Sequence, residues 1–217
     1  MIDSSKLDEL FADDYETSNE GKQTIRLNKN EATATVFDWL SSLVAALVIV
    51  LVIMTFVFRI IDVDGKSMEP TLIDTDKVVI TDLFYAPHQG DIVIISHAEE
   101  YSKPLVKRVI ATAGQDLRLD YANNAVYVDG VKLDEPYIQG NTVSGDVPES
   151  ELNGIVPEGK VFVMGDNRGI SLDSRYRQIG FIDESSIIGK AQLDIIPHKY
   201  ENGQLAFDIS GIRYVYN

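Results

Sequence analysis

The hydrophobic and polar positions divide the chain into three stretches of different character. Residues 1 to about 36 carry four Lys/Arg and eight Asp/Glu and few apolar residues. Such a composition buries too little surface to offset the entropy lost on ordering. We therefore predict an acidic, flexible tail over residues 1–36, which acts as a solvated spacer or, as the alternative, docks a cytoplasmic partner.

An apolar run, WLSSLVAALVIVLVIMTFVF, extends from Trp39 to Phe58 without a charged residue. As a helix it would be about 30 Å long, which matches the hydrocarbon core of a bilayer. We predict one transmembrane helix over residues 37–58, with Trp39 in the interfacial aromatic belt. The acidic start and the length of the run disfavour a cleavable signal peptide, and its apolarity on all sides disfavours a helix in a soluble core. Basic residues flank both ends about equally, so the pattern alone leaves the orientation open.

From Asp62 onward the pattern changes to short β-type runs separated by turn residues. The runs are KVVITDLFY (77–85), GDIVIIS (90–96), LVKRVIATAG (105–114), AVYVDGVKL (125–133), KVFVMGDNRG (160–169) and SSIIGKAQLDIIP (185–197). The Asp129-Gly130 pair predicts a hairpin with a type I′ turn. Because no later stretch has a long helical period, we predict a mostly β domain over residues 59–217, with antiparallel sheets arranged as a sandwich or barrel.

Charge and composition narrow the possible functions. The chain has 34 acidic and 19 basic residues and a net charge of -15, which repels phosphate backbones and argues against nucleic acid as a partner. Cysteine is absent, so disulfides, thiolate nucleophiles and Cys-ligated zinc are excluded. Three scattered histidines lack the spacing of a helical zinc motif, so we expect no metal and no other cofactor.

Hydrolysis without cysteine or a metal requires an oxygen nucleophile and a base. Ser67, in the stretch DGKSMEPTL just after the apolar run, is a candidate nucleophile. The three histidines, His88, His97 and His198, lie in turns or loops, and the chain lacks the G-x-S-x-G pattern of a nucleophile elbow, so we interpret them as surface residues.

Lysine is the other candidate base, because burial can lower its pKa from about 10.4 to a useful range. In PLVKRVIA, strand alternation places Lys107 on one face with Leu105 and Val109. The alternative is that Lys107 guards an edge strand against aggregation.

A third polar block, GDNRGISLDSR, separates two apolar runs. It is either a solvated turn or a salt-bridged scaffold that orients a nearby base. Its polar residues are Asp166, Asn167, Arg168, Ser171, Asp173, Ser174 and Arg175.

Taken together, these blocks resemble the bacterial type I signal peptidases, and in particular their Gram-positive-like, membrane-anchored form. The resemblance extends from the apolar run to roughly Lys190 and rests on four motifs in order: SMEPTL, GDIVII, LVKRVIA and GDNRGISLDSR. It implies a Ser-Lys dyad, a variant of the serine-histidine arrangement, with Ser67 as nucleophile and Lys107 as general base. The backbone N–H of Ser67 would contribute to the oxyanion hole, and Ser171 would hydrogen-bond Lys107. The implied supporting scaffold is Asp166, Arg168, Asp173 and Arg175, with Arg108 as a further member.

The resemblance also implies a substrate and a location. Such enzymes remove signal peptides from secreted precursors after small residues, usually Ala-x-Ala, and the substrate strand would add to a sheet edge. We therefore expect precursor proteins, membrane lipid and the nearby secretion translocon as partners, with Met68 on a lipid-facing surface. The expected location is the bacterial cytoplasmic membrane, with the N-terminus inside and the catalytic domain outside.

Two departures and two alternatives accompany this interpretation. Gly65 stands where some relatives have a serine that donates to the oxyanion, and ATAGQD replaces a Gly-x-Pro-Gly-Asp pattern. The insert over about residues 112–158 is short. One alternative is a catalytically silent assembly factor or chaperone for a surface structure; the other is a self-cleaving Ser-Lys regulator, which the apolar run disfavours.

Overall fold

The computed structural model describes residues 29–56, 58–81, 85–201, 203–208 and 211–215. The chain divides into two compact units, Met1–Val50 and Leu51–Asn217, and each is described by itself. Most of the predicted acidic tail therefore lies outside the described residues.

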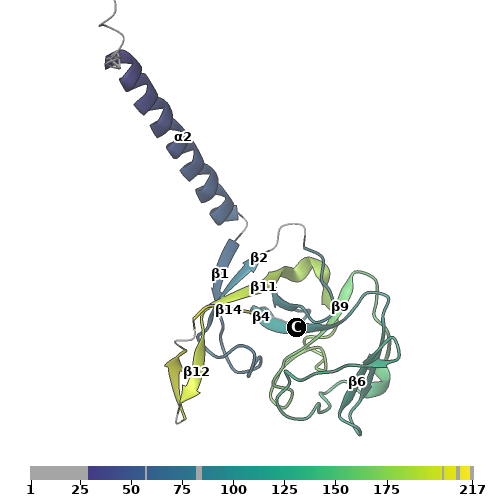
Figure 1. The fold of residues 1–217 in the computed structure, drawn as a ribbon. Coiled ribbons are helices and arrows are strands. Elements are labelled where there is room, and N and C mark those ends of the chain that lie inside the picture. The colour runs from purple at the N-terminus through teal and green to yellow at the C-terminus, as the bar shows by residue number, and fades with distance from the viewer. Residues whose placement is uncertain (1–28, 57, 82–84, 202, 209–210, 216–217) are drawn as a thin grey trace, which may run out of the picture. The chain divides into compact units, whose positions relative to one another are not determined.

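Most of the apolar run lies in helix α2 (Lys29–Phe56), shown in Figure 1. The sequence has no glycine or proline between these bounds, so nothing stops the helix from extending beyond the apolar residues. It begins before the predicted residue 37, and Phe58 belongs to the next strand instead. Among the described residues, no helix reaches the length and apolarity required to cross a membrane.

The second unit is built on an eight-stranded sheet in which the described pairings are all antiparallel. The strand order is β1-β2-β11-β3-β4-β9-β10, and β14 also pairs with β11. The strands are β1 (Phe58–Asp62), β2 (Lys77–Thr81), β3 (Ile92–Ile95), β4 (Leu105–Thr112), β9 (Lys160–Met164), β10 (Ile182–Asp183), β11 (Ile187–Ile196) and β14 (Arg213–Tyr214). Register shifts in β11 mark bulges, which bend a long strand and let it pair with β3 and then β2.

A second sheet of four described strands comes from the segment predicted as an insert. Its order is β7-β6-β5-β8, with β5 (Asp116–Asp120), β6 (Ala125–Val128), β7 (Val131–Lys132) and β8 (Gly154–Ile155). Asp129 and Gly130 both have positive φ, 53° and 78°, as a type I′ turn requires, so the predicted hairpin is confirmed. A short helix, α3 (Glu149–Leu152), precedes β8.

The buried side chains form three clusters, and the central strands contribute to more than one of them. Ile110 and Ala111 of β4 pack with the second sheet, whereas Leu105 and Val109 of the same strand pack with β3 and β9. A third cluster joins Met68 and other residues of the β1–β2 connection to β2 and β3. Strands covered on both faces read as continuous apolar runs, which explains why β3 and β4 were recognisable in the sequence.

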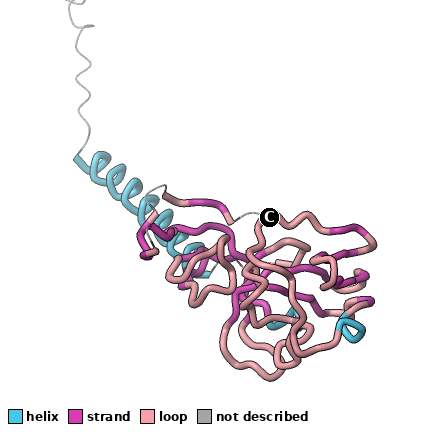
Figure 2. Tube along the Cα trace, turned by 90° about the horizontal axis from the view of Figure 1, so that it is seen from below, coloured by secondary structure: helices cyan, strands magenta, loops and turns pink. Residues whose placement is uncertain are grey.

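The prediction of a mostly β fold with antiparallel sheets is confirmed, and each of the six predicted runs contains a strand. Figure 2 shows how much loop connects these strands. Elements without a predicted counterpart are short: β1, β5, β8, β10, helix α3, the 3-10 helix η1 (Glu184–Ser186) and the C-terminal strands β12 (His198–Glu201), β13 (Gln204–Phe207) and β14.

Candidate active site

Ser67 lies in the connection between β1 and β2, in a loop fixed by short-range hydrogen bonds. The N–H of Gly65 donates to the Asp74 carboxylate at 2.8 Å, and the N–H of Leu72 donates to the Met68 carbonyl at 3.0 Å. Gly65 has a φ of 92°, which glycine adopts without strain. Met68 is only 1% exposed and packs in the core, so the prediction that it touches lipid is wrong. Its burial anchors the loop and leaves Ser67 half-buried at the surface.

Lys107 lies in the middle of β4 and is 2% exposed. Its ammonium Nζ donates to Ser67 Oγ at 2.8 Å and to the Val106 carbonyl at 2.9 Å. Because β4 pairs with β3 on one side and β9 on the other, Lys107 does not guard an edge strand. The fold thus brings together the two residues that the sequence analysis paired.

Burial lowers the pKa of the Lys107 ammonium from the ordinary 10.5 to about 8. The carboxylates of Asp173 and Asp166 oppose this shift because they stabilise the charged amine, and the Arg175 guanidinium adds to it. A lysine with a pKa near 8 is neutral in an appreciable fraction of molecules at pH 7. In that form its lone pair can accept the Ser67 proton.

The third polar block contacts the serine loop through Gly165 and Asn167. The Asn167 N–H donates to the Ser67 carbonyl at 3.0 Å, and its side-chain amide donates to the Lys66 carbonyl at 3.2 Å. A Cβ on Gly165 would lie 2.4 Å from the Ser67 carbonyl oxygen and 2.2 Å from Ser171 Oγ. Sequence reasoning gave neither residue a specific role. The sequence feature that could have pointed to Gly165 is its place at the end of a buried strand, where glycine often marks a close approach of two backbone segments.

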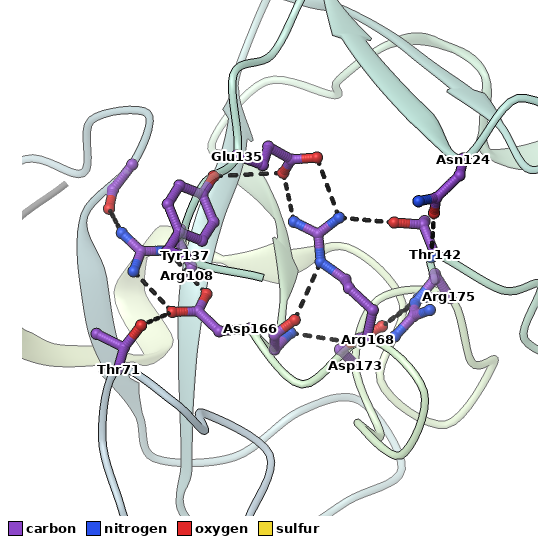
Figure 3. Close-up of polar contacts among 12 residues, drawn as sticks. Thr71, Arg108, Asn124, Glu135, Tyr137, Thr142, Asp166, Arg168, Asp173 and Arg175 are labelled. Atoms are coloured by element: carbon purple, nitrogen blue, oxygen red, sulfur yellow. Dashed lines mark hydrogen bonds and ion pairs between the residues drawn. The ribbon is translucent and has the colours of Figure 1, made fainter. Parts of the chain in front are cut away.

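Asp166 and Arg108 form a buried bidentate ion pair beside the serine loop (Figure 3). Arg108 Nε lies 2.8 Å from Oδ1 and its second terminal nitrogen 2.7 Å from Oδ2. The Thr71 hydroxyl donates to the same carboxylate, and the Arg108 guanidinium lies 3.8 Å from the centre of the Tyr137 ring. Asp166 therefore connects β4, which carries the lysine, to the loop that carries Ser67.

Two further arginines fix the rest of the block. Arg175 forms a bidentate pair with Asp173, with both N–O distances 2.8 Å, and Asp173 also accepts the Gly165 N–H at 3.0 Å. Arg168 donates to the Gly165 carbonyl at 3.1 Å and pairs with Glu135. A further bond joins Arg168 to the Thr142 hydroxyl at 2.8 Å (Figure 3). Glu135 and Thr142 belong to the predicted insert, where no local pattern distinguished them.

The predicted hydrogen bond between Ser171 and Lys107 is absent. The Ser171 hydroxyl is buried, and no described residue is its hydrogen-bond partner. The reason is geometric, because Lys107 directs its described bonds to Ser67 and Val106 instead. Ser171 Oγ lies against the backbone of Gly165, where it fills the space that a side chain at that position would occupy.

An apolar groove of about 710 Å³ opens beside Ser67 and Lys107. Its other lining residues come from β1, the serine loop, β3, the β3–β4 connection, β4, β11 and the third polar block. They include Ile61, Met68, Ile94, Lys103, Leu105, Val106, Ile170, Leu172 and Ile188.

None of the three histidines lines this groove. His88 and His97 are exposed, as predicted. His198 departs from the prediction of a surface residue, because its ring is largely covered and lies 3.1 Å from the buried carboxylate of Asp76.

A serine hydroxyl bonded to a buried amine, with both residues lining a mostly apolar groove on an antiparallel β frame, is an arrangement that a serine hydrolase could use. The family model described as signal peptidase, peptidase S26, matches residues 36–196. Signal peptidase IB of Staphylococcus aureus strain COL is 34% identical over 178 residues, covering 75% of this chain and 90% of the relative. Signal peptidase I of Bacillus licheniformis is 36% identical over 169 residues, covering 74% and 89%.

The chain therefore belongs to the signal peptidase family, peptidase S26, as a serine hydrolase of the bacterial type I kind. The resemblance drawn from the four motifs is confirmed. Among solved structures, a crystal structure of a signal peptidase I from Enterococcus faecalis V583 matches with a TM-score of 0.41 and 29% identity, over 49% of this chain and 97% of that chain.

Proposed function

We propose that the protein is a membrane-anchored endopeptidase that removes signal peptides from precursor proteins, with Ser67 as nucleophile and Lys107 as general base. The observation that carries the proposal is the 2.8 Å contact between Lys107 Nζ and Ser67 Oγ. The lowered pKa of Lys107 supports it, because a base must be neutral before it can take a proton.

In the proposed reaction Ser67 Oγ attacks the scissile carbonyl carbon while its proton passes to neutral Lys107. The ammonium then returns this proton to the leaving amine, which departs as the mature N-terminus and leaves an ester on Ser67. Water attacks the ester, Lys107 takes its proton, and that proton restores the serine hydroxyl as the signal peptide leaves as a carboxylate.

The oxyanion of each tetrahedral intermediate would accept a hydrogen bond from the backbone N–H of Ser67. No described residue is the hydrogen-bond acceptor for this N–H, so the donor is available to a substrate. Gly65 brings no side chain to the site, so it cannot supply the hydroxyl donor that some relatives have.

The ion pairs of the third polar block act as positioning groups in this proposal. Asp166, paired with Arg108, and Asp173, paired with Arg175, fix the backbone around Gly165, which contacts the serine loop. Arg168 joins the same backbone to the insert. These residues determine the distance between Ser67 and Lys107 without touching the substrate.

We propose that the groove accepts the signal peptide in extended form and that cleavage follows small residues in an Ala-x-Ala pattern. Its apolar lining suits short aliphatic side chains, since these lose little polar solvation on binding. Main-chain hydrogen bonds to the strands that line the groove would supply affinity that does not depend on sequence.

Anchoring in the cytoplasmic membrane, with the N-terminus inside, completes the proposal. It rests on the uncharged sequence from Trp39 to Phe58, since a substrate processed on leaving the membrane requires an enzyme held at its surface. Retention of the full chain in alkali-washed membranes, with the β unit open to external protease, would agree with it. Release into the wash would contradict it.

The test of function is cleavage of a precursor with an Ala-x-Ala site by the full chain in detergent or liposomes. Wild type should cut after the second alanine, and Ser67→Ala should lose at least about 10⁴-fold in kcat. Ser102→Ala, an exposed serine in a loop, is the matched control. Full turnover by Ser67→Ala would refute the nucleophile, and no cleavage by folded wild type would favour a catalytically silent assembly factor.

A further inference from the structure

The C-terminal segment lies beyond the family match, which ends at residue 196, yet it contacts the loop that carries Ser67. It contains the hairpin β12–β13 and strand β14, which pairs with β11 (yellow in Figure 1). We propose that residues 198–201, 203–208 and 211–215, called here the C-terminal brace, hold the serine loop in position for proton transfer. The inference rests on the function proposed above and adds positioning residues to it.

The inner contact of the brace is at Asp76, the residue that ends the serine loop. Asp76 is fully buried, and its carboxylate accepts the backbone N–H of His198 at 2.6 Å. The Arg213 guanidinium lies 3.2 Å from the same carboxylate and also donates to Asp194 of β11 at 2.9 Å. Two parts of the brace therefore meet on one buried carboxylate, which would be costly to leave unpaired.

Asp76 also forms hydrogen bonds with residues of the serine loop. Its carboxylate also accepts the Ile73 N–H at 2.8 Å, and its carbonyl accepts the Val63 N–H at 2.8 Å. The carbonyl of Val63 in turn accepts the Thr75 N–H at 2.9 Å. These hydrogen bonds join the two ends of the serine loop at Asp76, the residue that the brace contacts.

The outer contact is at Tyr200 in the hairpin and lies next to the nucleophile. The Tyr200 hydroxyl donates to the Glu69 carboxylate at 3.0 Å, and the Lys66 ammonium lies 5.6 Å from the centre of the Tyr200 ring, within cation–π distance. Lys66 and Glu69 stand on either side of the Ser67-Met68 pair. The hairpin therefore holds the loop on both sides of the serine.

The two faces of the loop are fixed by different parts of the chain. Asn167 fixes the carbonyls of Lys66 and Ser67 from the third polar block, and Tyr200 fixes the side chains of Lys66 and Glu69 from the hairpin. Loss of the hairpin contact leaves the fold and the groove intact but widens the range of Ser67–Lys107 distances. Proton transfer depends steeply on this distance, whereas substrate binding in the groove does not.

The experiment compares wild type, Tyr200→Phe, Tyr200→Ala and Glu69→Gln in the full chain, with an Ala-x-Ala precursor as substrate. Tyr200→Phe should lower kcat about 3- to 10-fold, the loss expected for one partly exposed hydrogen bond, at unchanged KM. Tyr200→Ala should lower kcat further, because it also removes the ring beneath Lys66. Tyr200→Phe combined with Glu69→Gln should be no slower than Tyr200→Phe alone, since the phenylalanine has already removed the hydrogen bond that the Glu69 carboxylate accepts.

Tyr127→Phe is the matched control, because Tyr127 of β6 also lies beneath a cation, Arg118, but in the second sheet. It should match wild type in kcat, KM and thermal midpoint. Hydrogen exchange of the segment Lys66–Leu72 should be faster in Tyr200→Ala than in wild type or the control, a readout that needs no catalysis. Unchanged hydrogen exchange in this segment of Tyr200→Ala would overturn the proposed role of the brace, even if no precursor were cleaved. A wild-type kcat in Tyr200→Ala, or a change in KM alone, would also overturn it.

Discussion

The pH dependence of cleavage tests the central claim about Lys107, that burial keeps its amine ready to accept a proton. The perturbation is pH itself, combined with Lys107→Arg. The pKa of a guanidinium is so high that the group stays protonated at every usable pH. Lys103→Arg is the matched control, since Lys103 lines the same groove but is exposed.

The expected magnitude follows from the shift of the Lys107 pKa from 10.5 to about 8. At pH 7 the neutral fraction of the amine rises from about 0.03% to about 9%, roughly a 300-fold gain, which corresponds to about 3 kcal/mol of differential solvation. Below pH 8, kcat/KM should fall about tenfold for each pH unit, and above pH 8 it should level off. Because a bound substrate excludes more water from Lys107, the rise of kcat with pH should occur at a lower pH than the rise of kcat/KM.

The assay measures initial rates of precursor cleavage between pH 5 and 10 for the three proteins. Lys107→Arg should be inactive throughout, without rescue at high pH, while Lys103→Arg should follow the wild-type profile. If wild-type kcat/KM kept rising up to about pH 10.5, desolvation of Lys107 would be refuted as the source of its reactivity. Activity of Lys107→Arg above about a tenth of wild type would refute the assignment of the base.

Three other perturbations test the packing around the site. Lys107→Met should raise the free energy of unfolding by up to about 3 kcal/mol at pH 7, with the gain shrinking as wild type loses its buried charge between pH 8 and 10.5; urea unfolding measures both. Gly165→Ala should lower kcat more than about 100-fold, because its Cβ would meet the Ser67 carbonyl at 2.4 Å, whereas Gly169→Ala has open space and should be active in the same assay. Burial, together with the neighbouring Asp76 carboxylate, raises the pKa of Asp194 to about 6. The native protein therefore binds this proton more tightly than the unfolded chain, and wild type should lose stability as the pH rises from about 4 through about 6. Asp194→Asn should lack that loss in denaturant unfolding at pH 4.5 and 7.5.

Strands with a clear apolar pattern could be predicted from the sequence, whereas strands defined by their neighbours could not. β3 and β4 are buried on both faces and therefore appear as apolar runs. β12 and β13 are short and largely exposed, and they form because each pairs with the other. Pairing of this kind leaves little pattern in a single strand.

At the site, residue types could be predicted but contacts between distant segments could not. Ser67 and Lys107 were candidates by residue type, the family resemblance paired them, and the fold places Lys107 Nζ 2.8 Å from Ser67 Oγ. Met68 was predicted to face lipid because it follows Ser67, but the turn that exposes the serine points Met68 into the core. Glu135 gave no signal, because its importance depends on an arginine that comes 33 residues later.

The charged groups around Lys107 fit its proposed role as the base and would not suit its neighbours to that role. Arg108, Arg168 and Arg175 are as deeply buried as Lys107, and each is paired with a carboxylate. Among the described residues, no carboxylate lies within ion-pair distance of Lys107 itself. The acids that would have held its proton are already bound by arginines, which cannot release theirs. The scaffold therefore fixes the backbone beside Ser67. Because its acids are paired with arginines, they only partly offset the burial that lowers the pKa of Lys107.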